Sequence, residues 1–230
     1  MEQYGITCAV AFAQNKFGFV FIADIGRAAE VAVTARFQNA GQSCIAAKRF
    51  IVVDAVHDAF VEALLARVAK LELGRNLAPM ARTDLRDSLH QQVIESIAAG
   101  ATCVIGGEVP DRAGAWYPAT ILTGVHAGMP AADEELFGPV AAVICVADED
   151  QALAAAGATA YGLGASVWTV DAARGERFAR KLPAGMTFVN DMVRSDPKLP
   201  FGGVKASGFG RELTEIGMRE FLNAKTVWVH

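Results

Sequence analysis

The sequence predicts an α/β fold with a largely parallel sheet and flanking helices, because short apolar runs alternate with longer helical ones. The run RFIVVD at Arg49–Asp54 is short, β-branched and continuously apolar, as expected of a buried strand. A helix should follow it, since apolar residues recur near helical spacing from Phe60 to Leu71. Thr83–Ala99 predicts a second helix, which Gly100 ends.

The same alternation continues to the C-terminus. Further strands are expected over Cys103–Gly107, Pro118–Thr123, Ala141–Val146, Gly164–Val170 and Met186–Asn190, and a terminal strand over Ala224–Val229. Further helices are expected over Arg27–Arg36, from Asp148 onward and over Ala172–Lys181. Cys103 and Cys145 fall in apolar runs, so we expect them to be core residues.

Composition excludes several classes of function. Of the 230 residues 53% are hydrophobic and 20% charged, which predicts a compact domain. A net charge of −4 without a long basic run argues against a nucleic-acid partner. No uncharged apolar stretch reaches the roughly 18 residues of a membrane-spanning helix, so no membrane partner is expected. The cysteines show no CxxC spacing, which predicts no metal site and fits a cytoplasmic location.

The segment FQNAGQSC, Phe37–Cys44, carries the first chemical signal. Small and amide residues surround one cysteine between an expected helix and an expected strand. A cysteine on such a turn can be exposed at a cleft, with its backbone N–H directed at a bound oxyanion. The alternative is a small buried thiol in a turn.

Four collinear segments resemble the aldehyde dehydrogenase superfamily, from about Arg27 to the end of the chain. FQNAGQSC is similar to its nucleophile segment and EELFGPV, Glu134–Val140, to its cofactor-contacting segment. PFGGVKASGFGRE, Pro200–Glu212, is similar to its C-terminal signature, and FLNAKTVWV, Phe221–Val229, to its terminal strand. The order of the four segments makes the resemblance specific.

The resemblance implies roles for three residues. Cys44 matches the nucleophile, whose thiolate attacks an aldehyde to give a thiohemiacetal. Hydride then passes to NAD or NADP, and water hydrolyses the resulting thioester. Glu135 matches the glutamate that holds the nicotinamide ribose hydroxyls, and Phe137 the aromatic residue packed near that ribose. The alternatives are a solvated surface acid for Glu135 and a core anchor for Phe137.

The segment NDMVRSDPKLPFGG, Asn190–Gly203, is similar to the bacterial succinate semialdehyde dehydrogenase branch. Arg194 and Ser195 match the loop that lines the aldehyde entrance, and they suit the distal carboxylate of a semialdehyde. Some members of that branch carry an arginine six residues before the nucleophile, where this chain has Gln38. Arg194 could equally be a surface ion-pair residue.

Parts of the family pattern are missing from these residues. A family subunit is about twice as long and opens with a Rossmann-type domain, whereas no GxGxxG follows a strand here. The family's general base lies in an ELGG block, and counting back from Cys44 reaches Val10 instead. We therefore expect an atypical segment over 1–18, a catalytic domain over 19–219 that lacks the Rossmann-type domain, and an oligomerisation strand over 220–230.

Two classes of function follow from this pattern. One is oxidation of an aldehyde, most simply succinate semialdehyde, by an enzyme of which this truncated chain alone is expected to be inactive or nearly so. The other is a non-catalytic assembly module that pairs with a full-length relative. In either case the terminal strand predicts a homo-oligomer. A general thiol enzyme such as an acyltransferase lacks a recognisable histidine partner for Cys44.

Overall fold

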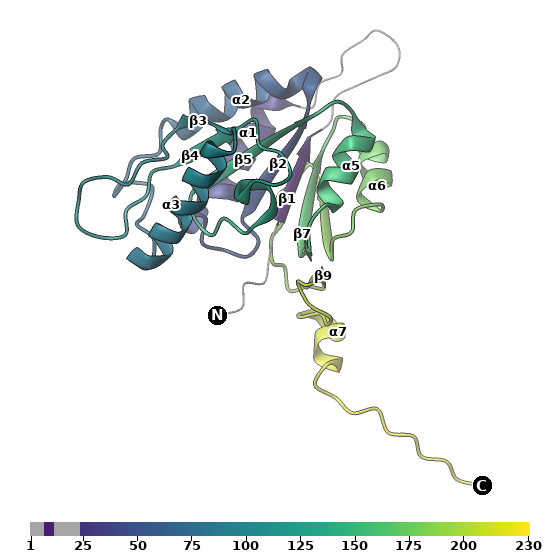
Figure 1. Cartoon of the computed structure of the whole chain (residues 1–230). Coiled ribbons are helices and arrows are strands. Elements are labelled where there is room, and N and C mark those ends of the chain that lie inside the picture. The colour runs from purple at the N-terminus through teal and green to yellow at the C-terminus, as the bar shows by residue number, and fades with distance from the viewer. Residues whose placement is uncertain (1–6, 12–23) are drawn as a thin grey trace.

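The computed structural model describes residues 7–11 and 24–230, and these form an α/β structure around one large sheet (Figure 1). The sheet has seven strands in the order β3-β4-β5-β2-β1-β7-β8. Every neighbouring pair is parallel except the antiparallel pair β3 and β4 at one edge. The strands are β1 (Thr7–Ala11), β2 (Ala47–Val53), β3 (Thr102–Ile105), β4 (Thr120–Thr123), β5 (Val140–Val146), β7 (Gly164–Trp168) and β8 (Met186–Val189). The predicted fold class is therefore confirmed.

Helices connect the parallel strands and flank the sheet (Figure 1). They are α1 (Ile25–Phe37), α2 (Asp54–Val68), α3 (Thr83–Ala98), α4 (Pro130–Asp133), α5 (Glu149–Gly157), α6 (Ala172–Ala179) and α7 (Thr214–Arg219). Asp24, Asp148 and Asp171 begin α1, α5 and α6, since each side chain accepts a hydrogen bond from a backbone N–H three residues on. Among the helices of the described residues, none is long and apolar enough to cross a membrane.

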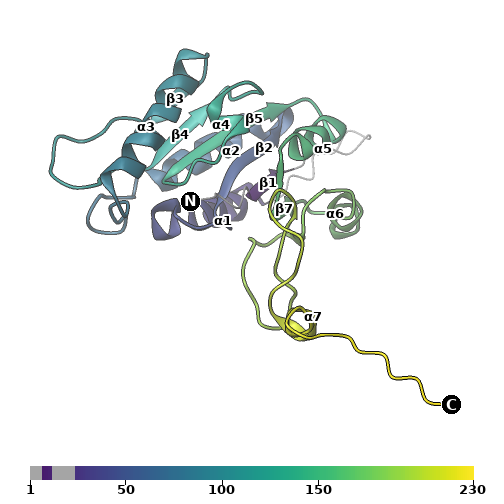
Figure 2. The same ribbon diagram turned by 60° about the horizontal axis from the view of Figure 1, so that its bottom comes forward.

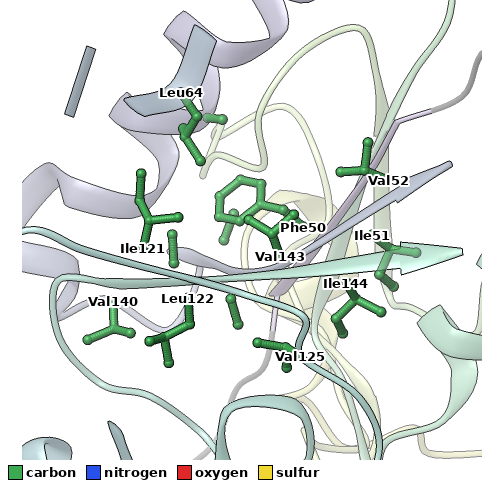
Figure 3. Packing of buried hydrophobic residues seen from close by; sticks show 14 of the residues in the cluster. Phe50, Ile51, Val52, Leu64, Ile121, Leu122, Val125, Val140, Val143 and Ile144 are labelled. Carbon is green, nitrogen blue, oxygen red and sulfur yellow. The ribbon is translucent and has the colours of Figure 1, made fainter. Parts of the chain in front are cut away.

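The core lies where the central strands meet α2 (Figure 3). Phe50 of β2 and its neighbour Val143 of β5 are buried there, and Leu64 projects from α2 on the same side of the sheet as Phe50. All seven residues of β2 are buried, which explains the apolar run from Phe50 to Val53. The strand order thus places β2, which directly follows the Cys44 turn, at the centre of the structure.

A small second sheet joins the C-terminal signature to the body. It pairs β6 (Tyr161–Gly162) antiparallel with β9 (Val204–Lys205). Two cations fix this region by donating to carbonyl groups at the C-terminal end of α5, where the helix dipole favours positive charge. Arg49 donates to Ala155 and Ala156 at 3.0 and 3.1 Å, and Lys205 donates to Gly157 and Thr159 at 2.9 and 3.0 Å.

Two expectations are wrong. Cys103 is only half-buried, because β3 is an edge strand, and Cys145 is exposed near the end of β5, with Sγ 3.7 Å from Asp54 Oδ1. The terminal residues 224–229 form no strand within the described chain. A strand needs a neighbour to pair with, and this segment instead runs away from the body beyond α7 (Figure 2).

The core position of Leu122 predicts a large stability loss on truncation. We expect Leu122→Ala to lower the free energy of unfolding by about 2–5 kcal/mol, because the side chain is fully buried in β4 and its removal leaves a cavity. Urea denaturation followed by circular dichroism measures this. Ile94→Ala is the matched control, since Ile94 is 45% exposed on α3, and a loss as large as that of Leu122→Ala would contradict the core assignment.

Candidate active site

Three segments that are far apart in the sequence meet at Cys44. The first is the turn that joins α1 to β2, the second is the loop between α4 and β5 that contains Glu135, and the third is the C-terminal signature from Pro200 to Glu212. Cys44 itself is exposed, so the alternative of a buried thiol in a turn does not hold.

The turn before Cys44 has an unusual backbone. A 3₁₀ turn, η1 (Gln38–Gly41), follows α1, and Asn39, Ala40 and Gly41 all have left-handed conformations with φ of 52°, 50° and 73°. For alanine this conformation costs about 1–2 kcal/mol. Local hydrogen bonds compensate: Asn39 Nδ2 donates to the carbonyl of Gln42 at 2.8 Å, and Gln42 Oε1 accepts from the N–H of Ala81 at 2.8 Å. The surrounding structure therefore imposes the turn that presents Cys44.

Gly41 brings this turn into contact with the Glu135 loop. A Cβ atom at Gly41 would lie 2.2 Å from the carbonyl oxygen of Gly138, which is far inside contact distance. Gly138 is packed from its other side by Leu89 and Met80. The two backbones can approach this closely only because residue 41 has no side chain.

Cys44 borders a groove of about 450 Å³. The C-terminal signature forms most of its wall, including Phe201, Arg211 and Glu212, and Phe221 also lines it. Arg211 stiffens the signature because its Nη1 donates to the carbonyls of Gly203 and Gly210, both at 2.8 Å. The groove is large enough for a small organic substrate beside the thiol.

The electrostatic surroundings keep Cys44 protonated at neutral pH. Partial burial raises the pKa of its thiol above the usual value, and the charges of Glu135 and Glu212 raise it further. The backbone N–H groups of Cys44 and Ile45 interact with the sulfur and oppose this effect. The backbone N–H of Cys44, which was expected to be directed at a bound oxyanion, thus interacts with the thiol in this structure.

Glu135 is buried rather than solvated, with 7% of its surface exposed. Burial raises the pKa of its carboxyl group, while the charges of Lys48 and Arg36 act in the opposite direction. The alternative of a solvated surface acid is therefore excluded. Phe137 is half-buried in the same loop, next to a fully buried Leu136.

Sequence reasoning missed the two buried cations beneath this loop. Arg36 is 1% exposed and Lys48 is 2% exposed. Lys48 Nζ donates to the carbonyls of Ala132 and Glu134, and so holds the loop from below. The sequence did contain a signal, since Arg36 shares the buried face of α1 with Ala28, Ala29 and Ala32, and Lys48 precedes Arg49 in a strand whose other residues are apolar.

The residues assigned to substrate binding lie apart from the Cys44 groove. Arg194 is exposed and pairs with Asp191, Nη1 to Oδ2, at 2.9 Å. It borders a second groove of about 540 Å³ along β8, which shares only Phe201 and Arg211 with the first among their lining residues. Ser195 is exposed beside Arg194, and Gln38 is half-buried at the start of the turn. The structure thus groups Cys44 with Glu135 but does not bring Arg194, Ser195 or Gln38 into the same groove.

The contact between the two loops can be tested at Gly41. We expect Gly41→Ala to destabilise the protein by more than the roughly 1–2 kcal/mol of a left-handed alanine, because its methyl group would collide with the Gly138 carbonyl. Gly128→Ala is the matched control, since Gly128 also has a positive φ of 93° but no atom within 4 Å of a Cβ. Equal losses for the two variants in thermal unfolding would show that the contact is unimportant.

Comparison with known proteins agrees with this arrangement of segments. The family model of the aldehyde dehydrogenase family matches residues 13–227. A curated relative from Mycolicibacterium paratuberculosis, named succinate-semialdehyde dehydrogenase [NADP(+)], is 47% identical over 213 residues, which are 90% of this chain and 45% of that protein. A Mycobacterium tuberculosis relative named succinate-semialdehyde dehydrogenase [NADP(+)] 1 is 46% identical over the same length and is covered to 47%. The chain therefore spans about half the length of the curated relatives it matches.

Solved structures show the same backbone. The succinic semialdehyde dehydrogenase from Streptococcus pyogenes in complex with NADP+ has a TM-score of 0.88 and 31% identity, covering 98% of this chain and 49% of that one. A betaine aldehyde dehydrogenase from Staphylococcus aureus in complex with NAD+ has a TM-score of 0.86 and 31% identity, covering 96% of this chain and 44% of that one. With a family match over almost its whole length, the chain belongs to the aldehyde dehydrogenase family.

Proposed function

We propose that this chain supplies the nucleophile domain of an NAD(P)-dependent aldehyde dehydrogenase, with Cys44 as the nucleophile. The observation that supports this most directly is the exposed Cys44 at the end of a strained turn, beside a groove walled by the C-terminal signature. Such a turn presents the sulfur to a small carbonyl compound while the polypeptide around it stays fixed. The sulfur would add to the aldehyde carbon to form a thiohemiacetal.

The raised pKa of Cys44 means that a further group must activate it. At neutral pH the thiol is protonated, and the thiolate is the reactive form. Cys44 alone is therefore a poor nucleophile. The nearby carboxylates of Glu135 and Glu212 lower the fraction of thiolate further, because their charges raise the pKa of the thiol. This supports the expectation that the 230-residue chain is inactive or nearly so by itself, because a protonated thiol attacks a carbonyl group slowly.

The residues of the Glu135 loop fit a nicotinamide cofactor in their chemistry. A carboxylate can accept hydrogen bonds from both hydroxyl groups of a ribose, and Lys48 and Arg36 favour the charged form that does so. Glu135 would hold the ribose and the half-buried Phe137 would pack beside it. When bound, the cofactor supplies the acceptor for the aldehyde hydride. The names of the curated relatives favour NADP, whereas the related solved structures include complexes with both NAD+ and NADP+.

Succinate semialdehyde is the substrate that we propose, on the strength of the curated relatives at 46–47% identity that carry this name. Arg194 and Ser195 would recognise its distal carboxylate, as a guanidinium and a hydroxyl can. This requires Arg194 to exchange its ion pair with Asp191 for the substrate. Because the pair is exposed, the exchange costs about 1 kcal/mol or less.

The nucleophile role predicts a thiol-dependent reaction even without the dehydrogenase reaction. We expect the purified chain to cleave an activated ester slowly and Cys44→Ala to abolish this cleavage, measured as release of a coloured phenolate. Cofactor reduction with succinate semialdehyde, followed by ultraviolet absorbance with NAD and NADP in parallel, should stay near background. Cys145→Ala is the control, because Cys145 is also exposed but lies away from the groove.

Two outcomes would contradict these expectations. Equal ester cleavage by the wild-type chain and Cys44→Ala would remove the nucleophile assignment. A Cys44-dependent reduction of NAD or NADP would instead show that residues within this chain supply the cofactor site and the base.

A second candidate function is assembly, for which the C-terminal segment gives a specific observation. Phe221 is 92% exposed and Trp228 is 78% exposed, in a segment that projects from the body (Figure 2). At the same time β8 is an edge strand of the large sheet, bordered by the second groove. Exposed apolar residues and an unpaired edge are features that a strand from another subunit would cover. We propose a homo-oligomer, or pairing with a full-length relative, through this segment.

Assembly predicts that the exposed tryptophan controls the oligomeric state. We expect the chain to elute as a dimer or larger species in size-exclusion chromatography with light scattering, and Trp228→Glu to shift it toward the monomer. Ile94→Glu is the control, since it places the same charge at an exposed apolar position of α3. A wild-type chain that remains monomeric, and does not co-elute with a full-length relative, would rule out this function.

A further inference from the structure

Arg36 occupies a position that is costly for a charged side chain. It lies on the last turn of α1, almost completely removed from solvent, and burial lowers its pKa to about 10. Its Nη2 donates a hydrogen bond of 2.6 Å to the carbonyl oxygen of Gly41 in the turn before Cys44. Its Nε is buried without a hydrogen-bond partner among the described residues. A buried guanidinium of this kind needs a nearby negative charge.

Glu135 supplies that charge from the neighbouring loop. The two residues interact electrostatically, and Glu135 is itself buried. The segments that carry the two residues meet where Gly41 lies against Gly138. A Cβ atom placed on Gly41 would also lie only 2.7 Å from Arg36 Nη2. Arg36 therefore holds one loop through a hydrogen bond and attracts the other through its charge.

We propose that Arg36 is a positioning residue for the nucleophile, which holds the Cys44 turn against the Glu135 loop and balances the Glu135 charge beside the thiol. The inference rests on the proposed roles of Cys44 and Glu135. Arg36 has no contact with the groove in which an aldehyde would bind, since it is not among the residues that line it. It acts through the two loops.

The charges around Cys44 give this role a measurable signature. Glu135 and Glu212 both raise the pKa of the thiol, and Arg211 and Glu220 are the other charged residues that line the groove. Arg36 is the cation nearest in sequence to the turn, and its positive charge offsets that of Glu135. The buried Lys48 also offsets the Glu135 charge, so without Arg36 this compensation would be incomplete, and the thiol would lose its proton only at higher pH.

The experiment measures how fast iodoacetamide alkylates Cys44 as a function of pH, in the full 230-residue chain. Mass spectrometry of the Cys44 peptide separates this site from the other cysteines. Arg36→Met and Arg36→Lys are each made in the wild-type chain and in Glu135→Gln. Methionine removes the charge but keeps much of the length, whereas lysine keeps the charge.

We expect Arg36→Met to move the midpoint of the pH profile upward by about half a unit or more, because one of the two compensating cations is gone and only Lys48 remains. Glu135→Gln should move it downward, and in that background Arg36→Met should have a clearly smaller effect. Arg36→Lys should leave the midpoint close to that of the wild type. This dependence on Glu135 is a result that a merely space-filling arginine would not give.

Several results would overturn the proposal. They are an unchanged midpoint in Arg36→Met, an equal shift in both backgrounds, or a shift in Arg36→Lys as large as that in Arg36→Met. If Arg36→Met unfolds alone but folds together with Glu135→Gln, the charge balance is supported. If neither substitution folds in either background, Arg36 is a core residue and the positioning role is rejected.

The alkylation experiment is independent of the proposed dehydrogenase reaction, since it needs neither aldehyde nor cofactor. Loss of ester cleavage or of cofactor reduction therefore leaves its result unaffected. Conversely, a failure of the Arg36 proposal would not touch the assignment of Cys44 as nucleophile. The two inferences can thus fail separately.

Discussion

The close approach of two peptide backbones at Gly41 and Gly138 is the constraint on which the site depends. It joins the end of α1 to the start of β5, two elements separated by about a hundred residues, at a point where no side chain intervenes. This contact brings the turn that carries Cys44 and the loop that carries Glu135 together, so that the Glu135 charge acts on the thiol.

Buried cations hold these loops in a consistent way. Arg36, Lys48 and Arg49 are all nearly inaccessible, and each donates to backbone carbonyls at the end of a turn or helix rather than forming a simple ion pair. These hydrogen bonds, one from Arg36 and two each from Lys48 and Arg49, offset part of the cost of burying the charges. The hydrogen bonds also fix the orientation of the peptide groups in the loops, because a carbonyl that rotated away would leave the buried cation without its acceptor.

The sequence allowed the fold to be predicted where structure is set locally. The apolar run of β2 and the spacing of apolar residues in α2 and α3 reflect burial of one strand or one helix face, and these predictions are confirmed. Predictions that depended on how a segment packs against or pairs with another segment were wrong in two cases. Cys145 was expected to be buried within an apolar run, but it is exposed near the end of β5. The segment 224–229 has no partner strand among the described residues.

For the site, the motif segments in the sequence identified Cys44 and Glu135 as candidate residues. They did not identify the buried residues around these two. Arg36 and Lys48 lie outside the expected site residues, because a charge on an apolar face is recognised as important only once its partners in space are known. Arg194 shows the opposite limit. Its position in the sequence suggested a place beside the substrate, yet the loop geometry and the ion pair with Asp191 direct it into a different groove.

The protonated state of Cys44 also bears on the lifetime of the protein. Peroxides attack the thiolate, so a thiol with a raised pKa passes slowly to sulfenic acid and from there to the irreversible sulfinic and sulfonic acids. An exposed nucleophile that stayed ionised would be consumed by oxidants between encounters with its substrate. Partial burial, and to a smaller extent the charges of Glu135 and Glu212, thus slow the oxidation of Cys44 as well as its reaction with a substrate.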